Sequence, residues 1–288
     1  MSLSKSEMAE NTKNQIISTP LGLVEPHAPL LTIPQDGQLL YKVMTVENLI
    51  RSVGGNYLHL NRVDSYVDLS GSNLIADSND GRQLPKDETV NSQIGFEKAP
   101  DSTMADYYDK SRSRTYACCF SMENSNYIWE HYGNGSAKGK VCLVFEFSKL
   151  RTTLNETFRH GNAVLECNGT QCHQIFSINY GNIEYVNWDV HKANAKRLPN
   201  PIRYTYLKDK TKFSEEKEFR ISLSAMGIGE FVLKDGNKLP FPPSLHVPFL
   251  FKTAIGDGTL RPMLCAPDTE IDFLNAELNK LQITADIK

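Results

Sequence analysis

The chain has 288 residues, of which 40% are hydrophobic and 23% are charged, and this composition excludes a disordered or fibrous protein. Its 31 basic and 34 acidic residues leave a net charge of −3. The molecule as a whole therefore has no field that would draw it to nucleic-acid phosphates or to anionic lipid. A local basic patch remains open as an alternative to a solvated loop face, because Arg112, Arg114, Lys138 and Lys140 could lie together.

The N-terminal segment and the cysteines indicate the compartment. Residues 1–23 contain no apolar core of about 7–15 residues, so we expect no secretory signal. No later segment reaches the roughly 18 apolar residues of a membrane helix. The six cysteines are too sparse for a disulfide scaffold and are expected to be thiols. We therefore expect a cytoplasmic protein without a membrane partner; the oligomeric state is not indicated.

The first regular elements are predicted after a flexible arm, or an extended segment that wraps around the domain. Four prolines in residues 1–38 block helix and weaken sheet, and one α+β domain is expected over 39–288. Residues 39–43 favour a strand. The apolar spacing from Val46 to Val53 then indicates a helix that Thr45 opens and Gly54-Gly55 closes, and residues 57–60 favour a second strand.

A polar segment interrupts the domain at about residues 69–113. Its Ser, Asn, Asp, Gly and Pro content is typical of a long mobile insertion, with some helix near 104–108. Residues 115–120 then form an apolar run suited to a central strand. Ser121 is predicted to cap a helix over 123–132. The strongest strand pattern of the chain follows at 141–147.

The remaining residues favour further strands and one amphipathic helix. Asn168-Gly169 is predicted to turn a hairpin, and the C-terminal helix carries apolar residues at Ile271, Leu274, Leu278 and Leu281. Strands do not alternate with helices. The fold class predicted is therefore α+β, with a mixed, mainly antiparallel sheet and a few flanking helices. The expected strands and hairpin arms cover 163–167, 172–179, 183–188, 219–224, 230–234 and 246–255.

Four segments in order resemble a bacterial and phage-associated family of proteins of unknown function. They are Leu40-Tyr41-Lys42; the loosely matching 60–68; the group formed by Cys119-Phe120-Ser121, 128–132 and 140–146; and Glu216-Lys217-Glu218-Phe219-Arg220. Met44 departs from the arginine that the family often has. The resemblance implies a fold and a bacterial or phage-conflict setting, and it does not establish an activity.

A more distant resemblance is to ADP-ribosyltransferases, which cleave the nicotinamide–ribose bond of NAD and transfer ADP-ribose to a nucleophile. It implies NAD as cofactor, with Lys42 as the early basic residue, Ser121 in the nicotinamide pocket, and Tyr41, Tyr132 and Arg220 as further binding residues. Glu218 would stabilise the cationic transition state, and Glu216 would activate the acceptor, a protein or a nucleic acid. Lys42 departs from the usual His or Arg. NAD glycohydrolysis belongs to the same hypothesis.

Three other interpretations stay open. The glutamates could be the polar face of an edge strand. His131 could shuttle protons or hold a phosphate, or could bond a backbone carbonyl while Trp129 and Tyr132 pack in the core. The chain could also be a non-catalytic interaction module that binds a partner through its insertion.

Metal chemistry is the least favoured class. Cys167, Cys172 and His173 lack the second pair of ligands that a structural zinc site needs. Glu215-x-Lys217 satisfies the minimal motif of a metal-dependent nuclease, which would also need Asp64 or Asp68. We expect no metal.

Overall fold

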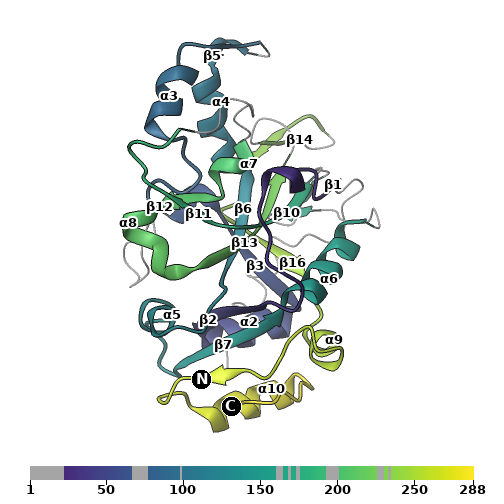
Figure 1. Cartoon of the computed structure of the whole chain (residues 1–288). Helices are drawn as coiled ribbons and strands as arrows, with labels where there is room; N and C mark the ends of the chain where they lie inside the picture. The colour runs from purple at the N-terminus through teal and green to yellow at the C-terminus, as the bar shows by residue number, and fades with distance from the viewer. Residues whose placement is uncertain are drawn as a thin grey trace.

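The computed structural model describes residues 23–66, 77–97, 99–159, 165–167, 170–172, 176–192, 201–225, 230–232 and 235–288. A nine-stranded sheet runs through the molecule, with the order β1-β10-β13-β6-β2-β7-β17; β3 attaches to β6, and β16 attaches to β3 (Figure 1). All of its pairs are antiparallel except β1 with β10. The predicted α+β class with a mainly antiparallel sheet is confirmed. The strands are β1 (Leu23–Val24), β2 (Leu39–Thr45), β3 (Tyr57–Arg62), β6 (Thr115–Ser121), β7 (Lys140–Glu146), β10 (Phe176–Asn182), β13 (Glu218–Ala225), β16 (Ser244–Pro248) and β17 (Leu264–Cys265).

The sheet divides along one edge of β6. Strand β2 meets β6 only at Tyr41, opposite Ser121, whereas β3 meets β6 at Asn61 and Arg62, near its other end. Between these contacts the edge of β6 pairs with no strand of the described residues. Side chains take over part of the pairing: the Lys42 ammonium lies 3.0 Å from the Cys119 carbonyl, and the Tyr66 hydroxyl lies 3.3 Å from the Ala117 carbonyl. The division leaves room for a cavity within the core sheet.

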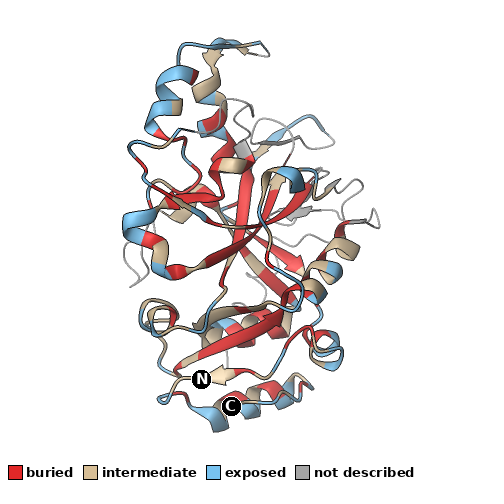
Figure 2. Ribbon diagram, viewed as in Figure 1, coloured by how far each residue is buried: buried red, intermediate tan, exposed pale blue. Residues whose placement is uncertain are grey.

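Helices cover the sheet and close its core. Thr45 caps α2 by accepting a hydrogen bond from the Asn48 amide, as predicted, and Asn56 ends the helix in the left-handed conformation. Buried residues concentrate along the central strands and on the inner faces of the helices (Figure 2). The flanking helices are α2 (Val46–Gly55), α6 (Phe147–Arg159), α9 (Phe251–Gly256) and α10 (Ile271–Lys280).

The described part of the insertion is folded and projects from the body at the top of Figure 1. Its base packs on a small apolar cluster with Leu84, Tyr108, Trp188 and Tyr204. A reciprocal capping box between Thr103 and Asp106 begins α4, where helix was predicted. The mobile loop expected here is therefore structured wherever it is described. Its elements are α3 (Pro85–Asn91), β4 (Gly95–Phe96), β5 (Ala99–Thr103), α4 (Met104–Ser111) and η3 (Arg112–Arg114).

Short elements complete the described chain. Strand β11 pairs with β12 in parallel, β8 with β9 and β14 with β15 antiparallel. No described helix is long and apolar enough to span a membrane. Among described residues the cysteines at 118, 119, 142 and 265 are free thiols. The elements are η1 (Ala28–Leu30), α5 (Asn126–His131), β8 (Leu165–Cys167), β9 (Thr170–Cys172), β11 (Glu184–Val186), α7 (Pro201–Tyr204), β12 (Leu207–Asp209), α8 (Lys210–Phe213), η4 (Ser214–Glu216), β14 (Glu230–Val232) and β15 (Lys238–Pro240).

Several predicted boundaries need correction. Ser121 does not cap α5, because it ends β6 and its hydroxyl bonds the backbone of Glu123; the helix begins at Asn126. The strand predicted over 246–255 ends at Pro248, and α9 follows.

The described part of the arm is docked rather than free: β1 pairs with β10, and Glu25 forms an ion pair with Arg151. Asn168-Gly169 lies outside the described residues, between the antiparallel strands β8 and β9.

Candidate functional site

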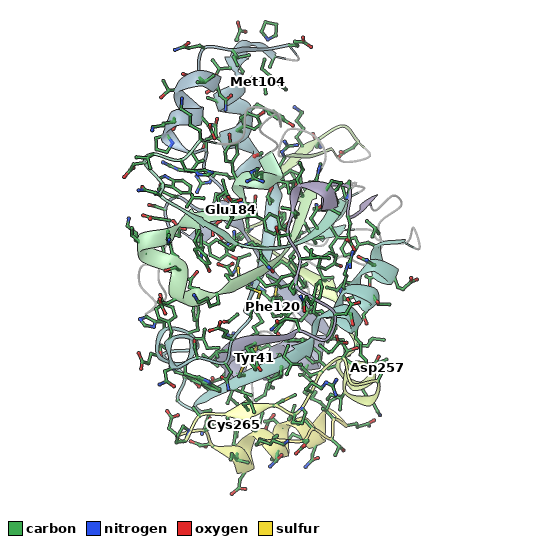
Figure 3. The ribbon with its side chains drawn as sticks, viewed as in Figure 1. Tyr41, Met104, Phe120, Glu184, Asp257 and Cys265 are labelled. Atoms are coloured by element: carbon green, nitrogen blue, oxygen red, sulfur yellow. The ribbon has the colours of Figure 1, made fainter. Side chains whose placement is uncertain are left out.

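A cavity of about 500 Å³ lies where the sheet divides. Its volume is in the range of pockets that bind small molecules and cofactors. Strands β2, β3, β6 and β13 contribute to its walls together with α2, the residues after α5, and the base of the insertion. Tyr41 and Phe120, labelled in Figure 3, mark the level at which β2 and β6 meet. The cavity is therefore built mainly on rigid core elements.

A row of three side chains crosses the sheet beside this cavity. Ser121 lies opposite Tyr41 on β2 and opposite Glu218 on β13. Residues directly opposite in neighbouring strands point to the same face. Two residues further along, Cys119 is opposite Arg220, and both also line the cavity. Three segments far apart in the sequence thus bring Tyr41, Ser121 and Glu218 to one wall.

Buried ion pairs connect the carboxylates of this wall. The Lys208 ammonium lies 2.7 Å from Glu216 Oε2 and 2.7 Å from Glu218 Oε2. Arg220 Nε donates to Glu218 Oε1 at 2.8 Å, while its two terminal nitrogens donate to the Asp80 carboxylate at 2.7 and 3.0 Å. The cluster formed by Asp80, Lys208, Glu216, Glu218 and Arg220 is called the ionic cluster below. It contains three carboxyl groups and two cations, so it presents excess negative charge to the cavity.

The two glutamates of the cluster differ in acidity. Burial raises the pKa of Glu218, but the Arg220 and Lys208 cations outweigh burial and hold this pKa far below its usual range. Burial raises the pKa of Glu216 above its usual value, since the neighbouring Lys208 offsets burial only in part and Glu218 adds repulsion. The pKa of Lys208 rises well above normal because both glutamates together overcome the effect of its own burial. Of the two glutamates, Glu218 is therefore the one that its cation partners hold in the ionised form.

Lys217 holds an unusual backbone conformation between the two glutamates. Its φ of 47° lies in the left-handed region, and its carbonyl accepts a hydrogen bond from the Met122 amide at 2.9 Å. A non-glycine residue in this region is strained by about 1–2 kcal/mol, and such strain tends to gather at functional sites. The turn at Lys217 leads from η4 into β13 and places both glutamates on the cavity.

We expect Lys217→Gly to raise the free energy of unfolding by up to about 1 kcal/mol, because glycine adopts positive φ without strain. Urea unfolding measures the change. Lys212→Gly is the matched control: it removes an exposed lysine from α8 and should destabilise by about 1 kcal/mol or less. A fall in stability for Lys217→Gly like that of the control would contradict the strain.

A second zone of the cavity carries two cations, Lys42 and Arg51. Lys42 of β2 donates to the Cys119 carbonyl, and its ammonium lies 5.3 Å from the centre of the Phe120 ring. Arg51 of α2 donates to Asn48 Oδ1 at 3.3 Å, while its buried Nε has no hydrogen-bond partner among the described residues. Within the described chain neither cation has a carboxylate partner. The cavity therefore combines an acidic wall with a basic zone.

Most of the residues proposed from the sequence line the cavity, but not all of them do. Six of the eight line the cavity and have other roles open to them, namely Tyr41, Lys42, Ser121, Tyr132, Glu216 and Glu218, although the polar groups of several are also hydrogen-bonded within the protein. Arg220 also lines it, but all three guanidinium nitrogens are occupied by Glu218, Asp80 and the Thr205 carbonyl. His131 is not among the lining residues: its Nδ1 lies 2.9 Å from the Tyr127 carbonyl, and its ring stacks on Tyr127. We therefore assign His131 no chemical role.

Four charged residues of the site were not anticipated from the sequence. Asp77 and Asp80 come from the insertion, Lys208 from β12, and Arg51 from the outer turns of α2. Only Arg51 could have been proposed from the sequence. It lies on α2, which directly follows the strand of Lys42 and whose apolar face was already identified. The other three enter through contacts between residues far apart in the chain.

The nuclease motif gains no support from its described residues. Glu215 is exposed and does not line the cavity, and Asp64 forms an ion pair with Arg62 at 2.6 Å. Asp68 and His173 lie outside the described residues, as do the side chains of Cys167 and Cys172.

Comparison with known proteins adds no family: no protein-family model matches the chain, and no curated protein matches it.

Proposed function

We propose that the cavity binds NAD and that the protein cleaves the bond between nicotinamide and ribose, passing ADP-ribose to an acceptor. One observation carries the proposal: β2, β6 and β13 bring Tyr41, Ser121 and the ionised Glu218 into one row at a cavity of cofactor size. These strands contain the three segments on which the resemblance to ADP-ribosyltransferases depends.

The charges of the acidic wall suit this reaction. Loss of nicotinamide leaves positive charge on the ribose, and a fixed carboxylate stabilises that charge without reorganising during the reaction. Glu218 is held on both oxygens, by Arg220 and by Lys208, so its orientation is set before the ligand binds. Each carboxylate oxygen has a further lone pair that can accept a ribose hydroxyl.

The basic zone suits the diphosphate of NAD. Lys42 and Arg51 are cations without carboxylate partners in the described chain, and guanidinium and ammonium groups are the usual ligands of phosphate oxygens. We expect Lys42→Met and Arg51→Met each to raise the Kd for NAD about tenfold or more. Titration calorimetry measures this. Lys252→Met, at an exposed position of α9, should leave the Kd unchanged. Equal affinity in all three variants would place the phosphates elsewhere.

The decisive test is release of nicotinamide from NAD, followed by chromatography with and without a cell lysate as the source of acceptor. Release in either condition supports the proposal, and the condition shows whether an added acceptor is needed. Absence of release in both, together with absence of NAD binding by calorimetry, rejects it.

A non-catalytic interaction module is the second candidate, and the ionic cluster favours it. Every carboxylate of that cluster is paired with an internal cation, as expected of charges that stabilise a fold. The projecting insertion also exposes Val90 and Ile94, which a partner could cover. A protein of this kind would not release nicotinamide.

A further inference from the structure

Asp77 is a buried carboxylate of the cavity that the ionic cluster leaves out. Its residue is 6% exposed and lines the cavity at the base of the insertion. Oδ1 accepts the Asn79 amide at 2.9 Å, and within the described chain the side chain takes part in no ion pair. Burial, with repulsion from Asp80, raises the pKa of Asp77 above its usual value. This carboxylate therefore keeps accepting capacity toward the cavity.

Glu216, by contrast, is poorly placed to accept a proton. The Tyr132 hydroxyl donates to Oε1 at 2.5 Å, and the Lys208 ammonium donates to Oε2 at 2.7 Å. A base must lie within hydrogen-bond reach of the proton that it removes. Each Glu216 oxygen already holds one donor of the protein, which leaves one lone pair on each, whereas Asp77 accepts only the Asn79 amide among the described residues. The acceptor-activating role expected for Glu216 fits Asp77 better.

The loop that carries Asp77 is held against the site. Arg112 Nε donates to the Asp80 carbonyl at 2.8 Å, and the Asp80 carboxylate binds Arg220. Gly81 has a φ of 69°, and a Cβ there would lie 2.7 Å from Val63 Cγ1, so the loop packs closely on the body. The loop is thus anchored to the site at Asp80, three residues after Asp77, through the Asp80 carbonyl and the Asp80 carboxylate.

The depth of these carboxyl groups also restricts the acceptor. Glu218 is 4% exposed and Glu216 is 3% exposed. A side chain of a folded macromolecule would have to enter the cavity beside NAD to reach the reacting carbon, whereas a water molecule needs only about 30 Å³. The burial of both carboxyl groups therefore favours water over a macromolecular acceptor.

We propose that Asp77 is the general base of an NAD hydrolase and that water is the acceptor; this rests on the proposed function. The bond between ribose C1′ and the nicotinamide nitrogen breaks, and nicotinamide leaves as a neutral molecule with the bonding electron pair. The water oxygen bonds to C1′, and its proton passes to Asp77 and then to solvent. NAD and water thus give ADP-ribose, nicotinamide and a proton, with Glu218 stabilising the cationic stage.

Azide rescue separates this role from a structural one, because azide attacks C1′ without losing a proton. Asp77→Ala and the isosteric Asp77→Asn should release nicotinamide about a hundredfold more slowly than the wild type, with the Kd for NAD unchanged. Sodium azide should restore release in Asp77→Ala and yield the azide adduct of ADP-ribose. Azide should leave the slow release of Glu218→Gln unchanged. Asp101→Ala, an exposed aspartate of β5, should behave like the wild type.

The outcomes distinguish the two proposals. Full activity of both Asp77 variants, or a slow Asp77→Ala that azide leaves slow while NAD still binds, overturns the role of Asp77 alone. Release that requires lysate overturns water as acceptor and leaves NAD cleavage standing. A wild-type protein that neither binds NAD nor releases nicotinamide overturns the proposed function itself. Far-ultraviolet circular dichroism shows that each variant compared is folded.

Discussion

Glu218→Gln should lower the rate of nicotinamide release by a factor of about 10²–10³, the usual effect of removing one fixed group that stabilises transition-state charge. Glutamine keeps the size of the side chain and removes its negative charge. The Arg220 and Lys208 cations would then face the developing positive charge of the ribose with less compensation. Single-turnover release, followed by chromatography with the protein in excess over NAD and at a concentration above the Kd, measures the change in the chemical step.

Glu215→Gln is the matched control, since Glu215 is three residues away, exposed and outside the cavity. It should retain the wild-type rate. Because Glu218→Gln also disturbs buried ion pairs, the Kd for NAD and the thermal unfolding of the variant are measured alongside. A folded Glu218→Gln protein that binds NAD and releases nicotinamide at the wild-type rate would remove Glu218 from the chemistry.

Arg220→Met should lower the free energy of unfolding by about 3–5 kcal/mol, the largest stability change expected of a single substitution in this site. Arg220 is fully buried, and its loss would leave the Asp80 carboxylate without its partner and Glu218 with Lys208 alone. A buried carboxylate without a partner bears the full cost of its lost hydration. Urea unfolding with linear extrapolation measures the effect.

Arg203→Met supplies the comparison. Arg203 pairs with Glu184 at 2.7 Å, but the Glu184 side chain is 50% exposed, so we expect a loss of about 1 kcal/mol or less. Adding Asp80→Asn to Arg220→Met should recover part of the lost stability, because it removes the stranded charge. Equal losses of unfolding free energy in Arg220→Met and Arg203→Met would show that the buried pairs of the ionic cluster stabilise the protein no more than an exposed pair does.

Local patterns were sufficient to predict the central elements. Strand β2, helix α2 and strand β7 follow from short-range spacing and from the Thr45 cap, and the structure has them close to the predicted bounds. Helix α6 was missed although Phe147, Leu150, Leu154 and Phe158 repeat at helical spacing. The strong strand signal before it and its threonines, which favour strands, obscured that repeat.

Only part of the site could be predicted, because its geometry depends on pairing between strands that are far apart in the sequence. The motif residues Lys42, Ser121 and Glu218 were found as separate pieces, and nothing local indicates that Tyr41, Ser121 and Glu218 share one register. Asp80 and Arg220 are 140 positions apart, and each taken alone is an ordinary charged residue. The insertion resembles a loop by composition, so nothing in the sequence indicated that its buried Asp77 and Asp80 would line the cavity.

The division of the sheet at β6 has a consequence for how a ligand would be received. The walls on either side are interior strands rather than lids, and such segments open only in the rarest fluctuations of a native protein. The empty and filled forms should therefore share one shape, and amide protons of β6 and β13 should exchange slowly even before a ligand arrives. The protein would lose little conformational entropy on binding. Affinity would therefore depend on how well the polar and charged groups of the ligand fit those of the cavity walls.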